Sequence, residues 1–397
     1  MAGPPPPPQP DADPADLRYR VALHRVHRLG SARFAVLDRA FPSFEHAWRA
    51  SRAELRAAGL DDRSAAAVVL ARAETDVDGE MERLERAGVR ALAWGTPGYP
   101  ERLATIDDAP PLLYVRGAWT ADDEWGVAIV GTRRATAYGR QAAGELARGL
   151  GANGVTVVSG LARGVDTVAH RAALDAGGRT VAAFASGLDT VYPPENRRLA
   201  EEIVERGALV SDYPLGARPR AEHFPRRNRL LAGMTLGTLV VEGEHTSGAM
   251  ITARFALDQG REVFVVPGSI FSPQSRGPLG LLRDGATPVT RAGDVLEALN
   301  LTVIGAQLDF GRAAPPANEA ERAVMGALGM EPRHVDEVLR RSGLAAGTVS
   351  ATLALLELKG LVREVGGMQY VRVRENAPAY GAAGLRRGAG TGSERPS

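Results

Sequence analysis

The residues best suited to chemistry lie in three short stretches rich in glycine, hydroxyl-bearing and arginine side chains. Their sequences are GTRRATAYG (131–139), SGLARGVD (159–166) and HFPRRNR (223–229). Arginine forks, and backbone N–H groups at turns and helix starts, are donors that recognise phosphate. The three stretches contain no obvious set of acid, base and nucleophile for breaking a bond. We therefore expect a binding protein with no catalytic residues.

The first stretch begins with Gly131, Thr132 and Arg133, directly after the apolar run Val127 to Val130. Glycine permits a tight turn, threonine caps a helix or bonds a phosphate, and arginine offers a planar, permanently charged fork. The glycine spacing does not match the GxGxxG pattern of dinucleotide sites, so no nicotinamide or other cofactor is expected. The alternative is that Arg133 pairs with a carboxylate on a neighbouring loop.

The second stretch also follows an apolar run, and it concentrates residues that form a compact nest for an anion. These residues are Ser159, Gly160, Arg163 and Gly164. Asp166 stands at the start of the next helical segment, where we expect it to cap the helix rather than to act as a base. His170, one turn later, is expected to pack inside the protein.

The third stretch is the densest basic cluster in the middle of the chain. Its candidate binding residues are Phe224, Arg226, Arg227, Asn228 and Arg229. Cations at a helix N-terminus oppose the helix dipole, so their placement suggests a bound anion, and the aromatic ring is suited to stacking on a base. The alternative is a solvated basic helix start.

Two further segments support the same binding surface. Ser247 and Gly248 precede an apolar helical pattern and are expected to present a helix N-terminus to phosphate. Glu242 is expected to orient an arginine or a hydroxyl group. A Ser159, His170 and Asp166 triad matches no nucleophile elbow in spacing or order.

Composition narrows the class of protein. The chain has 397 residues, a formal net charge of +1 and no cysteine. Any nucleic-acid affinity must therefore come from a local basic patch, and disulfides, thiolate catalysis and cysteine-based zinc sites are excluded. No metal site is expected. No apolar run has the length of a membrane span, and the first residues lack the pattern of a signal peptide, so we expect a cytoplasmic protein.

The middle of the chain alternates apolar strand patterns with helical patterns, which predicts an α/β fold with a doubly wound, mostly parallel sheet of extended Rossmann-like type. Expected strands are 89–93, 127–130, 155–158, 180–184, 208–211, 238–241, 262–266 and 286–289. Expected helices are 139–151, 166–176, 195–206, 226–234, 248–259 and 292–299.

Pattern and composition divide the chain into successive parts. We expect a proline-rich disordered lead (1–16), a small helical domain of SAM or helix-hairpin-helix type (17–78), the Rossmann-like core (80–300), a linker (301–316), a winged helix (317–374) and a disordered tail (375–397). In the winged helix, three helical patterns precede two alternating strands joined by Gly366-Gly367.

These motifs resemble the DNA-processing protein A family (DprA, also called Smf). The resemblance covers residues 80–375 and rests on seven motifs in order, among them VAIVGTRRATAYG, VVSGLARGVDTVAHRAAL, HFPRRNRLLAG and GREVFVVPGSIFSPQSRGPLGLLRDGA. It implies a homodimeric single-stranded DNA-binding protein of natural transformation and competence. It also implies protection of incoming DNA and loading of the RecA recombinase onto it, with the single-strand-binding protein as a further candidate partner.

The resemblance assigns Arg133, Arg163, Phe224, Arg226, Arg227 and Asn228 to contacts with the DNA backbone and bases. The expected recognition helix of the winged domain departs from a duplex reader, because Lys359 is its only base. Two alternatives stay open: a phosphoribohydrolase-type enzyme on the same kind of sheet, with Glu242 or Asp166 as its carboxylate, and a winged-helix transcription regulator.

Overall fold

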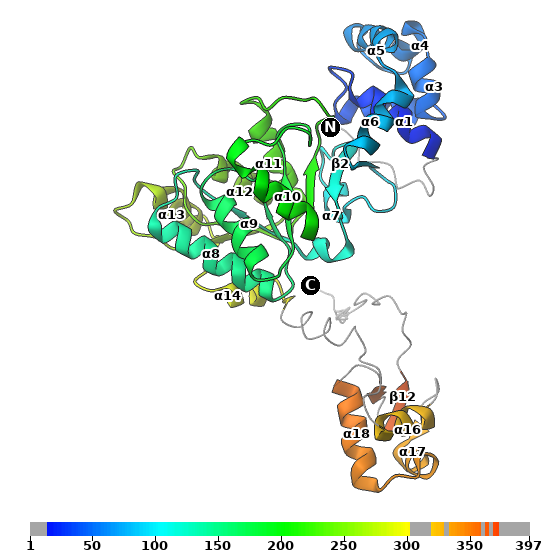
Figure 1. Cartoon of the computed structure of the whole chain (residues 1–397), viewed down its shortest axis with the longest axis vertical. Coiled ribbons are helices and arrows are strands. Elements are labelled where there is room, and N and C mark those ends of the chain that lie inside the picture. The colour runs from blue at the N-terminus through cyan, green and yellow to red at the C-terminus, as the bar shows by residue number, and fades with distance from the viewer. Residues whose placement is uncertain (1–13, 302–318, 329–332, 359–361, 365–367, 373–397) are drawn as a thin grey trace, which may run out of the picture. The chain divides into compact units, whose positions relative to one another are not determined.

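A computed structural model gives the fold of residues 14–301, 319–328, 333–358, 362–364 and 368–372 (Figure 1). The expected lead, linker and tail therefore lie wholly or mostly outside the described residues, as do Lys359 and Gly366-Gly367. Two compact units divide at residue 301, and each is described by itself.

Nine strands form the sheet of the first unit, in the order β1-β2-β6-β5-β4-β3-β7-β8-β9. The seven strands from β6 to β9 are parallel, whereas β1 and β2 pair antiparallel at one edge. The bounds are β1 Val89–Ala93, β2 Leu112–Gly117, β3 Val127–Val130, β4 Val157–Ser159, β5 Thr180–Ala183, β6 Ala208–Ser211, β7 Gly237–Val240, β8 Glu262–Val265 and β9 Thr287–Pro288.

Helices cover both faces of this sheet, as a buried parallel sheet requires. One face packs against α11 (His223–Gly233), α12 (Gly248–Asp258), α13 (Arg276–Arg283) and the short α7 (Glu101–Ala104). The other carries α8 (Ala137–Ala152), α9 (Val165–Asp175) and α10 (Arg197–Arg206), with α14 (Ala292–Ala298) beside α8. The predicted α/β fold is confirmed, and every strand expected from an apolar run is present. The sequence patterns did not predict α13, the strand β2 or the short α7.

The N-terminal segment folds as helices, as predicted. They are α1 Pro14–His24, α2 Ser31–Ala40, α3 Phe44–Arg49, α4 Arg52–Ala57, α5 Asp62–Glu74 and α6 Val77–Arg86. Val21 of α1 shares an apolar cluster with Leu84 of α6 and Tyr114 of β2. The helical segment is therefore packed directly onto the antiparallel edge of the sheet.

The second unit is a winged helix. It contains α16 (Glu319–Ala327), α17 (Val335–Ser342), α18 (Ala346–Leu358) and a sheet of β10 (Arg333–His334), β12 (Gln369–Arg372) and β11 (Val362–Glu364) in that order. Its core includes Val324, Val338 and Leu353. The sequence of α18 contains one charged residue, Glu357, and no arginine or lysine. Among the described residues of both units, no helix has the length and apolarity needed to cross a membrane.

A buried ion pair fixes the start of β3, the strand that leads into the first predicted loop. Asp123 is fully buried and accepts hydrogen bonds from Arg179 Nη2 at 2.8 Å, Thr156 Oγ1 at 2.9 Å and Thr120 N at 2.8 Å. Removal of the Asp123 carboxylate leaves the Thr156 hydroxyl and the Arg179 guanidinium without this partner. The Arg179 side chain is 28% exposed.

We predict that Asp123→Ala lowers the free energy of unfolding by about 2–4 kcal/mol, because one partner of a largely buried pair is removed. Urea unfolding measures this change. The exposed neighbour Asp122 provides the control, and Asp122→Ala is expected to change stability by less than about 0.5 kcal/mol. Equal effects of the two substitutions would contradict the role given to Asp123.

Candidate nucleic-acid interface

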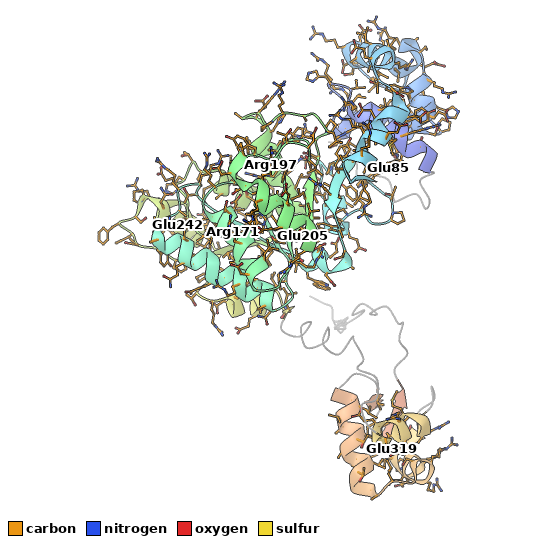
Figure 2. All side chains as sticks on the ribbon, in the orientation of Figure 1. Glu85, Arg171, Arg197, Glu205, Glu242 and Glu319 are labelled. Atoms are coloured by element: carbon orange, nitrogen blue, oxygen red, sulfur yellow. The ribbon has the colours of Figure 1, made fainter. Side chains whose placement is uncertain are left out.

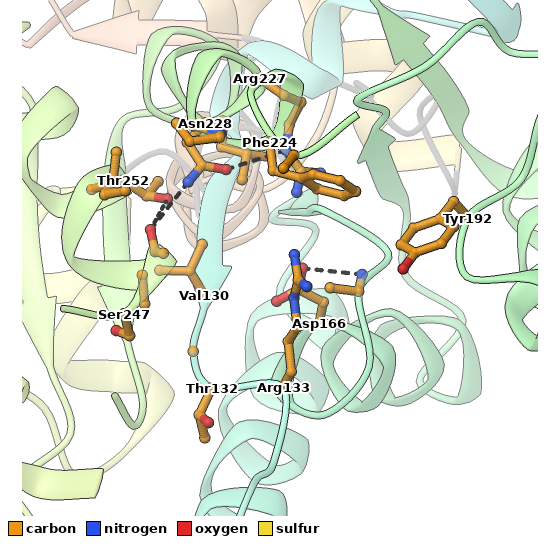
Figure 3. Close-up of a pocket in the computed structure, with 18 of the residues that line it drawn as sticks. Val130, Thr132, Arg133, Asp166, Tyr192, Phe224, Arg227, Asn228, Ser247 and Thr252 are labelled. Carbon is orange, nitrogen blue, oxygen red and sulfur yellow. Dashed lines mark hydrogen bonds between the residues drawn. The ribbon is translucent and has the colours of Figure 1, made fainter. Parts of the chain in front are cut away.

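A pocket of about 690 Å³ opens where β3 and β7 end (Figure 3). At β3 the order of the sheet reverses, with β4 to β6 on one side and β7 to β9 on the other. Such switch points are where open α/β sheets bind ligands. The charged side chains that line the pocket are four arginines, Arg133, Arg134, Arg220 and Arg227, and one carboxylate, Asp166. The pocket is therefore suited to an anion.

The inner wall of the pocket holds the buried guanidinium of Arg227, which is 4% exposed. Nη1 donates to the carbonyl oxygens of Gly160, at 2.8 Å, and Ala183, and Nε donates to Asn228 Oδ1 at 3.3 Å. Among the described residues, no carboxylate lies within 4.0 Å of this guanidinium. Burial lowers its pKa to about 10, so Arg227 stays cationic at neutral pH. A bound anion would offset the cost of that buried charge.

The mouth of the pocket combines an exposed cation with two aromatic rings. The exposed Arg133 side chain points toward Phe224 in Figure 3, with its Cζ atom 5.0 Å from the ring centroid. Tyr192, which is 44% exposed, faces the same ring at a centroid separation of 5.6 Å. Rings and an arginine in this arrangement can stack on a base while the guanidinium holds a phosphate.

Glu242, which is 3% exposed, fixes the loop that carries Arg133 through hydrogen bonds. Its carboxylate accepts from Thr136 N at 3.0 Å and Thr136 Oγ1 at 2.5 Å, and its carbonyl oxygen accepts from Thr132 N at 2.8 Å. The prediction that Glu242 orients a hydroxyl group is confirmed. Because both carboxylate oxygens are engaged, Glu242 acts as a scaffold for the loop.

Asp166 differs from the prediction. It is the second residue of α9, and its Oδ2 accepts from Gly160 N at 3.1 Å and Ala162 N at 3.2 Å, in the preceding loop. The expectation that it caps the helix was therefore wrong, because its side chain folds back over the loop. Burial raises the pKa of Asp166, while Arg227 and the two backbone bonds oppose that rise.

Ser247 and Gly248 line the pocket at the N-terminus of α12. Asn228 Nδ2 donates to Gly248 O at 3.1 Å, which ties this helix start to α11. Ser247 Oγ is buried and has no hydrogen-bond partner among the described residues. The free N–H groups of the first turn of α12 are the donors available to a phosphate oxygen.

The structure brings eight of the predicted residues to the pocket lining: Gly131, Thr132, Arg133, Phe224, Arg227, Asn228, Ser247 and Gly248. Ser159, Gly160 and Gly164 lie behind it. Ser159 is fully buried and its Oγ donates to Ile129 O at 2.6 Å. A Cβ atom on Gly160 would lie 2.3 Å from Arg227 Nη1, and one on Gly164 2.3 Å from Thr132 O. The geometry gives these three residues a packing role.

Arg163, Arg226 and Arg229 also lie away from this pocket. Arg163 is exposed and pairs with Glu195. Arg229 is 2% exposed, with Nη2 2.5 Å from Asp212 Oδ2, and Arg226 Nε is 3.5 Å from the same oxygen. The anion expected beside Arg226 and Arg229 is therefore a carboxylate of the protein itself. The buried Arg229 is unavailable to a ligand, which corrects its assignment.

The family model for DNA recombination-mediator protein A matches residues 90–300, and that for the DprA winged helix domain matches residues 309–368. The first match covers more than half of the chain and contains the whole pocket. The chain belongs to the DprA/Smf family.

Relatives and a solved structure agree with this assignment. Protein Smf of Synechocystis is 31% identical over 390 residues, which are 89% of this chain and 98% of that protein. DNA processing protein DprA of Bacillus subtilis is 40% identical over 213 residues, 53% of this chain and 72% of the relative. The crystal structure of DprA from Streptococcus pneumoniae superposes with a TM-score of 0.61 at 33% identity, covering 70% of this chain and 97% of the other.

Sequence reasoning missed Arg134, Tyr192 and Arg220, which also line the pocket. Arg134 stands beside Arg133 in GTRR, and Arg220 lies three residues before the third stretch, so proximity to a basic motif was an available signal. Tyr192 lies in YPPEN, which carries no positive charge. Only the fold brings it to Phe224.

His170 is fully buried, as predicted, and its Nδ1 lies 2.6 Å from Thr180 Oγ1. The Thr180 hydroxyl donates to Val157 O, so it accepts from a protonated Nδ1, and Nε2 is left without a proton or a partner among the described residues. Burial, aided by the charge of Arg227, lowers the pKa of His170 to about 3.

Between pH 6.5 and about 3, an unfolded chain therefore binds a proton at His170 that the folded protein does not. This contribution to stability is complete above pH 6.5 and is lost as the pH falls. Lowering the pH from 7 to 5 should therefore decrease the free energy of unfolding of the wild type. We predict that this decrease is about 2 kcal/mol larger in the wild type than in the variant His170→Gln. The exposed His27, changed to Gln, is the control. Identical pH profiles for wild type and His170→Gln would contradict the burial of a neutral imidazole.

Proposed function

We propose that this protein binds single-stranded DNA through the pocket between β3 and β7, without breaking a bond in it. The observation that carries the proposal is the excess of arginine there, including the buried Arg227 with no carboxylate within 4.0 Å among the described residues. Backbone donors, guanidinium groups and exposed rings recognise phosphate and the faces of bases without reading a sequence. Membership of a family named for DNA processing supports DNA as the polymer.

The same proposal places the protein in natural transformation and competence. There it would protect incoming single strands in the cytoplasm and load the RecA recombinase onto them, acting as a homodimer. The description of the matching family as recombination mediators supports this step. The single-strand-binding protein is a further partner in this scheme.

A phosphoribohydrolase on this sheet would need a carboxylate free to act at a sugar. Both candidates are engaged: Glu242 bonds Thr136, and Asp166 bonds two backbone N–H groups of the loop. This engagement favours binding over catalysis. Incubation of the full chain with each nucleoside monophosphate is expected to release no free base, and base release above the blank would overturn the non-enzymatic part of the proposal.

We predict that Arg133→Ala weakens binding to an oligothymidine about tenfold and lowers the slope of log K against log salt by about 0.7, because one phosphate contact is lost. Phe224→Ala is expected to weaken binding by about 1–3 kcal/mol with the salt slope unchanged, because stacking rather than charge is removed. Fluorescence anisotropy across a salt series measures both quantities.

The control for this experiment is Arg148→Ala. Arg148 is exposed on α8 and does not line the pocket. Its substitution lowers the net charge by the same amount as substitution of Arg133. If Arg133→Ala and Arg148→Ala bind alike, the pocket is not the binding site. The double change of Arg226 and Arg227 is unsuitable, since the buried Arg227 supports the fold.

A further inference from the structure

A second basic groove, of about 980 Å³, lies between the helical N-terminal segment and the core. One wall is the turn after α1, which includes Arg25, His27 and Arg28. The other is the segment from Asp212 to Arg226, which includes Arg218 and Arg220. Both walls belong to the first compact unit, where Arg25 Nη1 donates to Leu215 O at 3.1 Å.

Not all of these cations are available to a ligand. Arg25 lies 3.0 Å from Glu80, Arg226 lies 3.5 Å from Asp212, and Arg220 lies 3.9 Å from the exposed Glu222. Arg28 and Arg218 are different, because both are exposed and neither has a carboxylate within 4.0 Å among the described residues. They supply the uncompensated positive charge of the groove, one from each wall.

The backbone holds both of these arginines in place. Arg28 has φ 81°, a left-handed conformation that is uncommon for a residue other than glycine. Its carbonyl oxygen accepts from Arg33 Nη1 at 2.8 Å, and Arg33 is fixed in turn by Asp61 at 2.8 Å. The loop carrying Arg218 is tied to the core by the bond from Gly187 N to Ala217 O at 2.9 Å. Such local strain is characteristic of functional segments.

Tyr213 adds an independent sign of a missing partner. It lines the groove and is 8% exposed, and its hydroxyl is buried without a hydrogen-bond partner among the described residues. A buried hydroxyl without a hydrogen-bond partner destabilises the folded protein. Its ring is fixed by stacking on His223 at a centroid separation of 4.2 Å. Tyr213 is therefore a polar residue of the groove wall whose hydroxyl the described residues leave without a partner.

The groove adjoins the candidate nucleic-acid interface. Arg220 lines both, and its neighbours divide between them: Pro219 and Ala221 line the pocket, whereas Arg218 and Glu222 line the groove. A chain of phosphates leaving the pocket across this segment would next meet Arg218 and then Arg28. A separate anionic ligand would require no such continuity.

We propose that this groove is a second single-stranded DNA subsite, in which Arg218 and Arg28 bind phosphates of the strand that leaves the pocket. The subsite rests on the proposed function of the pocket and extends it to the N-terminal helical segment. The interaction is with the sugar-phosphate backbone, so it is independent of base sequence.

The test compares two oligothymidines with the full chain, one of about 5 nucleotides that fills only the pocket and one of about 15 that can reach both sites. In the double variant Arg28→Ala/Arg218→Ala, affinity for the short strand stays within twofold of wild type. Affinity for the long strand falls about tenfold, and its salt slope falls by about 1.4 for two lost phosphate contacts.

The matched control is Arg148→Ala/Arg171→Ala, which removes the same charge from exposed positions on α8 and α9 outside both sites. Figure 2 labels Arg171 on α9. Circular dichroism and thermal melting confirm that both double variants are folded. Equal weakening by the two double variants would reduce the effect to overall charge and overturn the subsite. Unchanged long-strand affinity in Arg28→Ala/Arg218→Ala would also overturn it and leave the groove to another occupant, such as an acidic protein segment.

Arg133→Ala separates this proposal from the one on which it rests. The proposed function requires Arg133→Ala to weaken the short strand. Failure there overturns the pocket itself, whereas failure of the groove variants alone overturns only the extension.

Discussion

The buried guanidinium of Arg227 is the interaction on which the pocket depends. It reaches from α11 to the ends of two adjacent parallel strands, where it donates to the carbonyl oxygens of Gly160 and Ala183. Through Asn228 it is also linked to the first turn of α12. A single cation therefore fixes three elements around the switch point of the sheet. Gly160 is constrained by the same interaction, because a Cβ atom would occupy the place of the guanidinium.

The carboxylates near the pocket support its shape and leave its charge positive. Glu242 accepts hydrogen bonds from Thr136, and Asp166 accepts them from the loop before α9. Asp212 pairs with Arg226 and Arg229. Each of these carboxylates is buried, and each holds a loop or a helix start in place through these bonds. The arginines at the surface are thereby left to act on a ligand. This separation of acidic residues inside from basic residues at the mouth is suited to holding a polyanion.

Much of the fold could be predicted because buried parallel strands are short apolar runs separated by helical patterns. The run VAIV coincides with β3, and the run VFVV differs from β8 by one residue at each end. α13 was missed because Gly277, Pro278 and Gly280 weaken its helical pattern, although a proline in the first turn is compatible with a helix.

The candidate site was harder to predict, because spacing along the chain does not reveal which arginines find a carboxylate. Three arginines of one motif have different surroundings. Arg226 is half-exposed, whereas Arg227 is buried and bonds to carbonyl oxygens. Arg229 is buried and pairs with Asp212. The difference depends on partners brought together only by the sheet order. Tyr192 and the groove beside Arg28 depend on it in the same way.

We propose that single-stranded DNA crosses the loops at the β3 and β7 switch point. Photo-crosslinking of a thymidine strand carrying a photoreactive base to the full chain, followed by peptide mapping, tests it most directly. Crosslinks are expected in peptides that contain residues 131–134, Tyr192 and 220–228. Crosslinks confined to the winged helix, residues 319–372, or to α8 and α14 would contradict it.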